Sequence, residues 1–148
     1  MKKITFIGDI HGNFKRYNQL VYKSEASIQI GDFGFAEDWF KLIHGRINHD
    51  EHKVLPGNHE NYDYLNDTII LHNLGDYGNI NFHGLDFFFV RGALSIDKDW
   101  RIPGISWWED EELSYQKLFD AVTLYEEIKP ETDEKALFNT DIVVRYIP

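Results

Sequence analysis

The sequence predicts an α/β fold built on a parallel sheet. Three short runs of apolar residues, at 3–7, 27–30 and 53–55, are rich in branched or aromatic side chains, as buried strands are. Segments with helical spacing lie between them, and this β-α-β-α-β order favours parallel strands joined by right-handed crossovers. Each run also ends at a cluster of polar residues. Ligands bind at the carboxyl ends of strands in such sheets, so the clusters mark the expected site.

Two helices are expected between these three strands. Residues 13–23 place apolar side chains, from Phe14 to Val21, at spacings that fit one helical face. Residues 36–47 show a similar pattern around Trp39 and are also expected to be helical.

The second half of the chain has a different pattern. Short apolar runs joined by turns that contain Gly, Asp or Asn favour a meander of strands over further crossovers. A longer amphipathic segment that ends before Pro130 predicts a helix. The expected strands are residues 68–71, 79–82, 85–91 and 141–147, and the expected helix is residues 111–128.

Composition narrows the class of protein. The 148 residues are expected to form a single domain over residues 1–148. Fifteen basic against 25 acidic residues give a net charge of -10, which argues against non-specific binding along a nucleic acid backbone. The absence of cysteine excludes disulfides and thiolate-bound zinc and favours a cytoplasmic protein. The apolar stretch at residues 4–7 is too short for a signal peptide or a membrane span.

The polar clusters at the three strand ends supply ligands for a divalent cation. Their carboxylates, imidazoles and amide suit Mn²⁺, Fe²⁺ or Zn²⁺. In an extended segment, side chains two residues apart lie on the same face, so the Asp and His of the first cluster can bind one cation. Each cluster alone is also typical of an ordinary turn, but their order after three strands favours a metal site. The clusters are Asp9-Ile10-His11-Gly12, Gly31-Asp32 and Gly57-Asn58-His59-Glu60.

This donor set favours metal-assisted hydrolysis of an ester. The carboxylate of Asp32 has two oxygens and can bridge two cations, and Asn58 offers a carbonyl oxygen to the second cation. Two cations about 3.5–4 Å apart stabilise both ends of an in-line displacement. His59 is then free to protonate the leaving oxygen, because an imidazole titrates near neutral pH.

The chain resembles the calcineurin-like metallophosphoesterase superfamily, and within it the small bacterial and phage-type phosphoesterases. The clusters match the pattern D-x-H, G-D and G-N-H-[DE] of that superfamily. The resemblance implies a layered α-β-β-α sandwich and hydrolysis of a phosphate mono- or diester, a small substrate, at a dinuclear site. It also implies that Asp9 and His11 bind the first metal, Asp32 bridges, Asn58 binds the second metal and His59 is the catalytic histidine.

The sequence departs from the superfamily pattern near residue 148. A histidine usually follows a strand of the form V-V-[ST]-H, but here Tyr146 stands at that position, and no G-H-x-H motif follows. We therefore expect a fold that is incomplete at the C-terminus, a weakened second metal site and slow or absent hydrolysis. Exposed apolar surface would then make a homo-oligomer plausible. Among the other histidines, His83 is the best spare ligand.

The sequence leaves two other functions open. The first is a catalytically inactive phosphoesterase-like module that binds a metal or a partner protein. The second is a nucleotide-binding domain, against which the absence of a glycine-rich phosphate loop counts.

Arg91 is expected to form a salt bridge or to contact a substrate phosphate. Trp100, Trp107 and Trp108 are expected in packing or in a wall against an organic leaving group.

Overall fold

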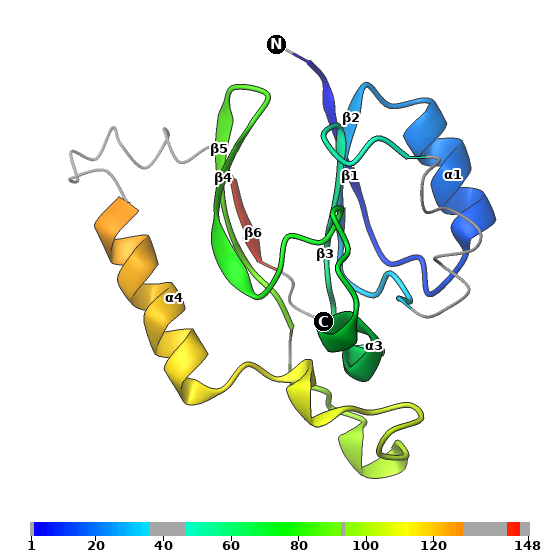
Figure 1. Cartoon of the computed structure of the whole chain (residues 1–148), viewed down its shortest axis with the longest axis vertical. Coiled ribbons are helices and arrows are strands. Elements are labelled where there is room, and N and C mark those ends of the chain that lie inside the picture. Colours follow the sequence, from blue (N-terminus) through cyan, green and yellow to red (C-terminus); the bar gives the residue numbers. More distant parts are fainter. Residues whose placement is uncertain (1, 36–46, 93, 129–141, 146–148) are drawn as a thin grey trace.

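The computed structural model describes residues 2–35, 47–92, 94–128 and 142–145. Its centre is a pair of sheets that pack face to face, with α1 outside one sheet and α4 outside the other (Figure 1). This mixed α/β arrangement confirms the layered fold class expected from the sequence. The expected helix at residues 36–47 lies outside the described residues, except for Ile47.

The first sheet positions the polar clusters. Its strands run in the order β1-β2-β3 and all its pairs are parallel, with Ile4 opposite Ala26 and Ser27 opposite His52. The carboxyl ends of the strands therefore meet at one edge of the sheet, as the sequence predicted. The strands are β1 (Ile4–Ile7), β2 (Ala26–Ile30) and β3 (His52–Leu55).

Helix α1 (Phe14–Tyr22) follows the first cluster and confirms the helix expected at 13–23. The side chain of Asn13 caps it by accepting a hydrogen bond from the backbone N–H of Arg16. Its buried residues pack with side chains from β1 and β3 into a core between the helix and the first sheet. The first cluster therefore lies between a strand end and a helix start.

The second sheet contains the strands β4, β5 and β6, in that order. β4 and β5 form an antiparallel hairpin, whereas β6 pairs parallel to β5 after the chain has passed through α4. In β5, Phe87 and Phe89 face the first sheet, and Phe88 packs on Tyr125 of α4. The elements are β4 (Tyr77–Phe82), β5 (Leu85–Val90), α4 (Tyr115–Ile128) and β6 (Ile142–Arg145).

The expected meander is only partly correct. The β4–β5 hairpin is present, but residues 68–71 form no strand. Helix α3 (Tyr62–Asp67), which was not predicted, ends just before this segment; it is capped by the Asn61 side chain and buries Tyr62 and Leu65. Of the apolar residues at 69–71, Ile70 is buried in the core, whereas Ile69 and Leu71 are exposed, so this run contributes one side chain to the core and no strand.

The helix expected over 111–128 begins later than the sequence predicted. A 3₁₀ turn, η2 (Glu109–Glu111), precedes it, and the buried side chain of Glu111 points away from solvent. A second 3₁₀ turn, η1 (Lys98–Trp100), lies earlier in the same loop. Within the described part of the chain, no helix combines the length and the apolar character needed to cross a membrane.

Candidate metal centre

Backbone hydrogen bonds hold the first two strand-end loops together. The carbonyl oxygen of Asp32 accepts the N–H groups of Ile10 and His11, at 3.2 and 2.8 Å, and the carbonyl oxygen of Phe33 accepts that of Gly12 at 2.9 Å. The loops after β1 and β2 are therefore fixed side by side. This brings residues that are some two dozen positions apart in sequence into one place.

Two of the expected ligands have an unusual backbone conformation. The φ angles of His11 and Asp32 are 43° and 42°, in the left-handed region that residues other than glycine seldom adopt. Such strain persists where the surrounding structure enforces it, and it occurs most often at functional sites. The hydrogen bonds between the two loops provide that enforcement here.

The structure brings together the side chains of Asp9, His11 and Asp32. One potential ligand atom from each lies within 4.8 Å of the other two, and His11 Nε2 is 3.6 Å from Asp32 Oδ2. Asp9 and His11 are exposed, whereas Asp32 is buried. Two carboxylates and an imidazole in this arrangement form a donor set that suits the divalent metals named above.

The third strand-end loop is tied to the same carboxylate. The backbone N–H of His59 donates to Asp32 Oδ1 at 3.0 Å. Gly57 lies so close that a Cβ there would be 2.1 Å from Asp32 Oδ1 and 2.3 Å from the Asp32 nitrogen. Only glycine fits at this position without a shift of one loop against the other.

Asn58 contributes an oxygen that lacks a hydrogen-bond partner among the described residues. Its side chain is buried, and its Nδ2 donates to Ser95 Oγ at 2.8 Å, while its Oδ1 is buried and unpaired. A buried, unpaired carbonyl oxygen costs about 1–3 kcal/mol. A cation that accepts this oxygen as a ligand would remove that cost, so the residues present fit a metal here.

His59 lies on the wall of a cleft beside these ligands. Its ring centroid is 5.6 Å from that of His11, in an edge-on arrangement. Both histidines line the cleft, which has a volume of about 690 Å³ and is large enough for a small phosphate ester. The loop after β5 also lines the cleft, through Arg101, Gly104, Ile105, Ser106 and Trp108.

Glu60 has a structural role that was not assigned from the sequence. Its buried carboxylate accepts N–H groups from Phe33, Gly34 and Phe35, at 2.5–2.8 Å, and from Gly57 at 3.4 Å. Burial raises the pKa of the Glu60 carboxyl to about 7, although these backbone donors act in the opposite direction. The acidic residue that ends the third cluster thus holds the second and third loops together.

Sequence reasoning also missed a buried polar group behind Asn58. Ser95, Arg101 and Glu111 are joined by hydrogen bonds of 2.6–2.9 Å, and Ser95 connects them to Asn58. The sequence carried no specific signal for this group, because Arg101 lies in a segment rich in Gly, Pro and Trp and Glu111 lies in the acidic run at 109–112.

The remaining polar candidates lie elsewhere. His83 Nε2 is 3.0 Å from Glu51 Oε2 at the β4–β5 turn, and His83 does not belong to the candidate ligand group. Arg91 is buried, with its Nε 2.5 Å from Asp76 Oδ1 and its guanidinium over the ring of Tyr62. Its salt bridge is therefore the alternative that the structure favours. Tyr146 lies outside the described residues.

The tryptophans of the loop after β5 differ in their surroundings. Trp100 is 89% exposed, and Trp107 lies under the ammonium group of Lys98, with 4.4 Å from Nζ to the ring centroid. Trp108 alone of the three lines the cleft, and its Nε1 donates to Asp63 at 3.1 Å. A leaving group in the cleft would therefore meet one indole ring.

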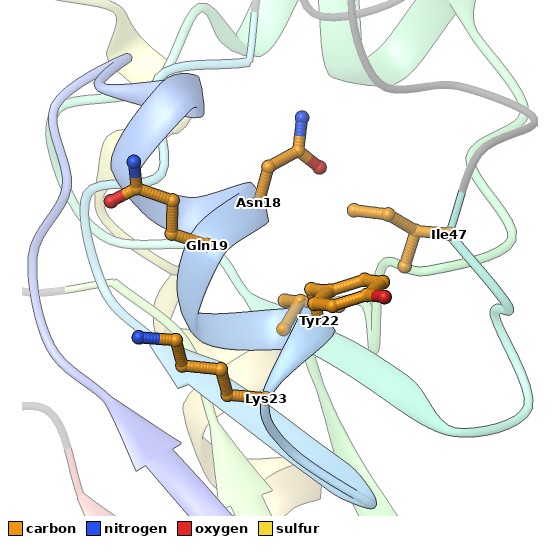
Figure 2. A pocket seen from close by; sticks show the side chains of 6 residues that line it. Asn18, Gln19, Tyr22, Lys23 and Ile47 are labelled. Atoms are coloured by element: carbon orange, nitrogen blue, oxygen red, sulfur yellow. The ribbon is translucent and has the colours of Figure 1, made fainter.

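A second hollow, of about 430 Å³, lies on the other end of α1 (Figure 2). Figure 2 shows the ring of Tyr22 beside Ile47 with Asn18 above them, whereas Gln19 and Lys23 extend to the left of the view. None of the residues that line it is a carboxylate or an imidazole. This hollow therefore lacks the carboxylate and imidazole ligands that are present at the metal centre.

Comparison with known proteins agrees with this geometry. A family model described as calcineurin-like phosphoesterase matches residues 2–145, which include all three clusters. No curated protein and no solved structure matches the chain significantly.

Proposed function

Because this chain belongs to the calcineurin-like phosphoesterase family, we propose that it is a metal-dependent hydrolase of a phosphate mono- or diester. The family implies metal-dependent hydrolysis of phosphoesters in general. The observation that carries the proposal is the meeting of Asp9, His11 and Asp32 ligand atoms within 4.8 Å, on the edge of a cleft. The natural ester would be a small molecule, as the size of the cleft suggests.

The proposed ligands fall into two sets. Asp9, His11 and Asp32 would hold one cation, and Asp32 and Asn58 would hold a second, with Mn²⁺, Fe²⁺ or Zn²⁺ as the candidates. When bound, such ions polarise a phosphoryl oxygen and lower the pKa of water. The second set has fewer donors among the described residues, so we expect it to bind its cation more weakly.

His59 is the proposed catalytic residue. Its backbone is fixed by the hydrogen bond to Asp32, and its imidazole lines the cleft beside His11. A ring nitrogen of His59 would give its proton to the ester oxygen that leaves. General acid catalysis of this kind typically contributes about 10²–10⁴-fold to the rate.

The test is hydrolysis of an aryl phosphate monoester and diester by the metal-free protein with and without added Mn²⁺. We expect Mn²⁺-dependent turnover that Asp32→Asn abolishes and that His59→Ala lowers by about 10²–10⁴-fold. Asp86→Asn is the matched control, because Asp86 is an exposed carboxylate on β5 that accepts a hydrogen bond from Asn81. Turnover no greater than that of Asp32→Asn would contradict the proposal, and bound Mn²⁺ without turnover would favour the inactive module.

A further inference from the structure

We propose that Ser95, Arg101 and Glu111 form a positioning relay that turns the carboxamide oxygen of Asn58 toward the cation site. The proposal rests on the proposed function only in naming a cation as the partner of that oxygen. The relay itself is a set of hydrogen bonds within this chain. It connects the loop after β3 to the segment between β5 and α4.

The relay is buried and closely bonded. Glu111 is 0% exposed and Ser95 is 4% exposed. Ser95 Oγ lies 2.7 Å from Glu111 Oε2, 2.8 Å from Arg101 Nη1 and 2.8 Å from Asn58 Nδ2. Arg101 also donates through Nη1 and Nη2 to the two oxygens of Glu111, at 2.9 and 2.6 Å. This bidentate contact favours the ionised carboxylate.

The donors and acceptors of Ser95 fix the direction of each hydrogen bond. A hydroxyl has one hydrogen to donate and two lone pairs that accept. An ionised Glu111 can only accept, so the Ser95 hydrogen goes to Glu111, and Arg101 can only donate, so it takes one lone pair. The remaining lone pair needs a donor, and the adjacent atom belongs to Asn58.

This leaves one orientation for the Asn58 carboxamide. Its NH₂ must face Ser95, and its oxygen must face away, where it is buried without a hydrogen-bond partner among the described residues. The opposite orientation would place a carbonyl oxygen against a lone pair of Ser95. The neighbouring residue His59 donates its N–H to Asp32, which places Asn58 beside the proposed bridging carboxylate.

The first test is the effect of relay variants on cation binding. Ser95→Ala removes the acceptor for Asn58. In Glu111→Gln, the Gln amide and Arg101 both donate to Ser95, so the Ser95 hydroxyl hydrogen turns toward Asn58 and favours the flipped carboxamide. Loss of such a supporting group typically weakens metal binding by about 10–100-fold. In calorimetric titrations, we expect each variant to lower the affinity for the second Mn²⁺ by that factor and to leave the affinity for the first Mn²⁺ unchanged.

Two matched controls separate this effect from general damage. Ser24→Ala removes a hydroxyl that donates to the carbonyl of Leu20, and Glu112→Gln neutralises the carboxylate next to Glu111, which contacts Lys98. Both controls should bind Mn²⁺ like the wild type. Thermal unfolding without metal shows whether each variant is folded.

A double variant tests the hydrogen-bond directions themselves. Asn58→Asp places a carboxylate oxygen against the Ser95 lone pair. It should therefore weaken the binding of the second Mn²⁺, although the new carboxylate adds a negative charge. In Asn58→Asp with Glu111→Gln, the Gln amide donates to Ser95 and the Ser95 hydroxyl donates to the Asp. We expect this pair to bind the second Mn²⁺ at least tenfold more tightly than Asn58→Asp alone.

A measurement without metal tests the relay separately from the proposed function. In the metal-free protein, the side-chain NH₂ hydrogens of Asn58 should exchange slowly with solvent, and in Ser95→Ala they should exchange rapidly. NMR spectra measure this exchange, and the Asn58 signals are identified by their loss in Asn58→Asp. Equal exchange, or unchanged Mn²⁺ binding in folded Ser95→Ala and Glu111→Gln, would overturn the relay. Wild-type protein that binds Mn²⁺ without hydrolysing esters, together with Asn58 exchange that is slow in the wild type and rapid in Ser95→Ala, would overturn the proposed function and support the relay.

Discussion

The backbone N–H of His59 donates a hydrogen bond to Oδ1 of Asp32 at 3.0 Å. The other carboxylate oxygen of Asp32 lies 3.6 Å from His11 Nε2. One carboxylate thus faces the proposed metal ligands on one side and fixes the backbone of the proposed catalytic residue on the other. A substitution that keeps an acceptor for the His59 N–H should affect metal binding alone, whereas one that removes the acceptor should also affect stability.

Asp32→Asn should abolish tight Mn²⁺ binding while the protein stays folded, because the amide oxygen can still accept the His59 N–H. Asparagine also tolerates the positive φ of this position better than alanine does. Asp32→Ala leaves that N–H without its acceptor, so its free energy of unfolding should be about 1–3 kcal/mol below that of Asp32→Asn. Urea denaturation of the two variants measures this difference, and equal stabilities would contradict it.

Gly57→Ala should destabilise the protein and weaken Mn²⁺ binding together. The added Cβ would overlap Asp32 Oδ1 and the Asp32 nitrogen, so one loop must shift. Overpacking of this kind costs about 1–3 kcal/mol. Gly8→Ala is the control, because no atom lies within 4 Å of a Cβ at that position. If both variants unfolded at the same urea concentration, the close approach of Gly57 to Asp32 would be wrong.

Glu60→Gln should lower the free energy of unfolding by several kcal/mol. Two backbone N–H groups point at each carboxylate oxygen, and an NH₂ in place of one oxygen would leave two donors without acceptors. Each buried, unpaired donor costs about 1–3 kcal/mol. Glu25→Gln, at an exposed carboxylate that accepts the N–H of Lys3, should change stability little. Chemical denaturation compares the two variants, and a similar small change in both would refute this role of Glu60.

His52 should make the protein less stable in mild acid. Burial lowers the pKa of the His52 imidazole below its ordinary value near 6.5, although the Glu51 carboxylate opposes this shift. Below that value the unfolded chain therefore binds more protons at this residue than the native state, so stability falls as the pH decreases through about 6.5. Denaturation at pH 7.5 and 5.5 should show a larger loss for the wild type than for His52→Asn. A loss of equal size in both proteins would exclude His52 as the cause.

The parts of the fold that could be predicted are those set by local pattern. Strands ending in Asp9, Asp32 and Asn58 clusters, with a helix after the first, follow from apolar runs and spacing over a few residues. Helix α3 had a local signal that was missed, the capping residue Asn61, and the apolar run that follows the helix was wrongly interpreted as a strand.

The polar contacts behind the site could not be predicted in this way. The direction of the Asn58 carboxamide depends on Ser95, which is 37 residues away in the chain, and through it on Glu111, which lies 16 residues beyond Ser95. The parallel pairing of β6 with β5 likewise joins residues separated by α4, so the final strand could be expected from its own residues but its partner could not.

The most direct test of the central claim is a crystal structure of the protein grown with Mn²⁺, with data collected at the manganese absorption edge. The account predicts an anomalous peak in contact with the side chains of Asp9, His11 and Asp32, and a weaker one reached by Asp32 and the Asn58 oxygen. Manganese bound elsewhere, or these side chains too far apart to share an ion at saturating Mn²⁺, would contradict it.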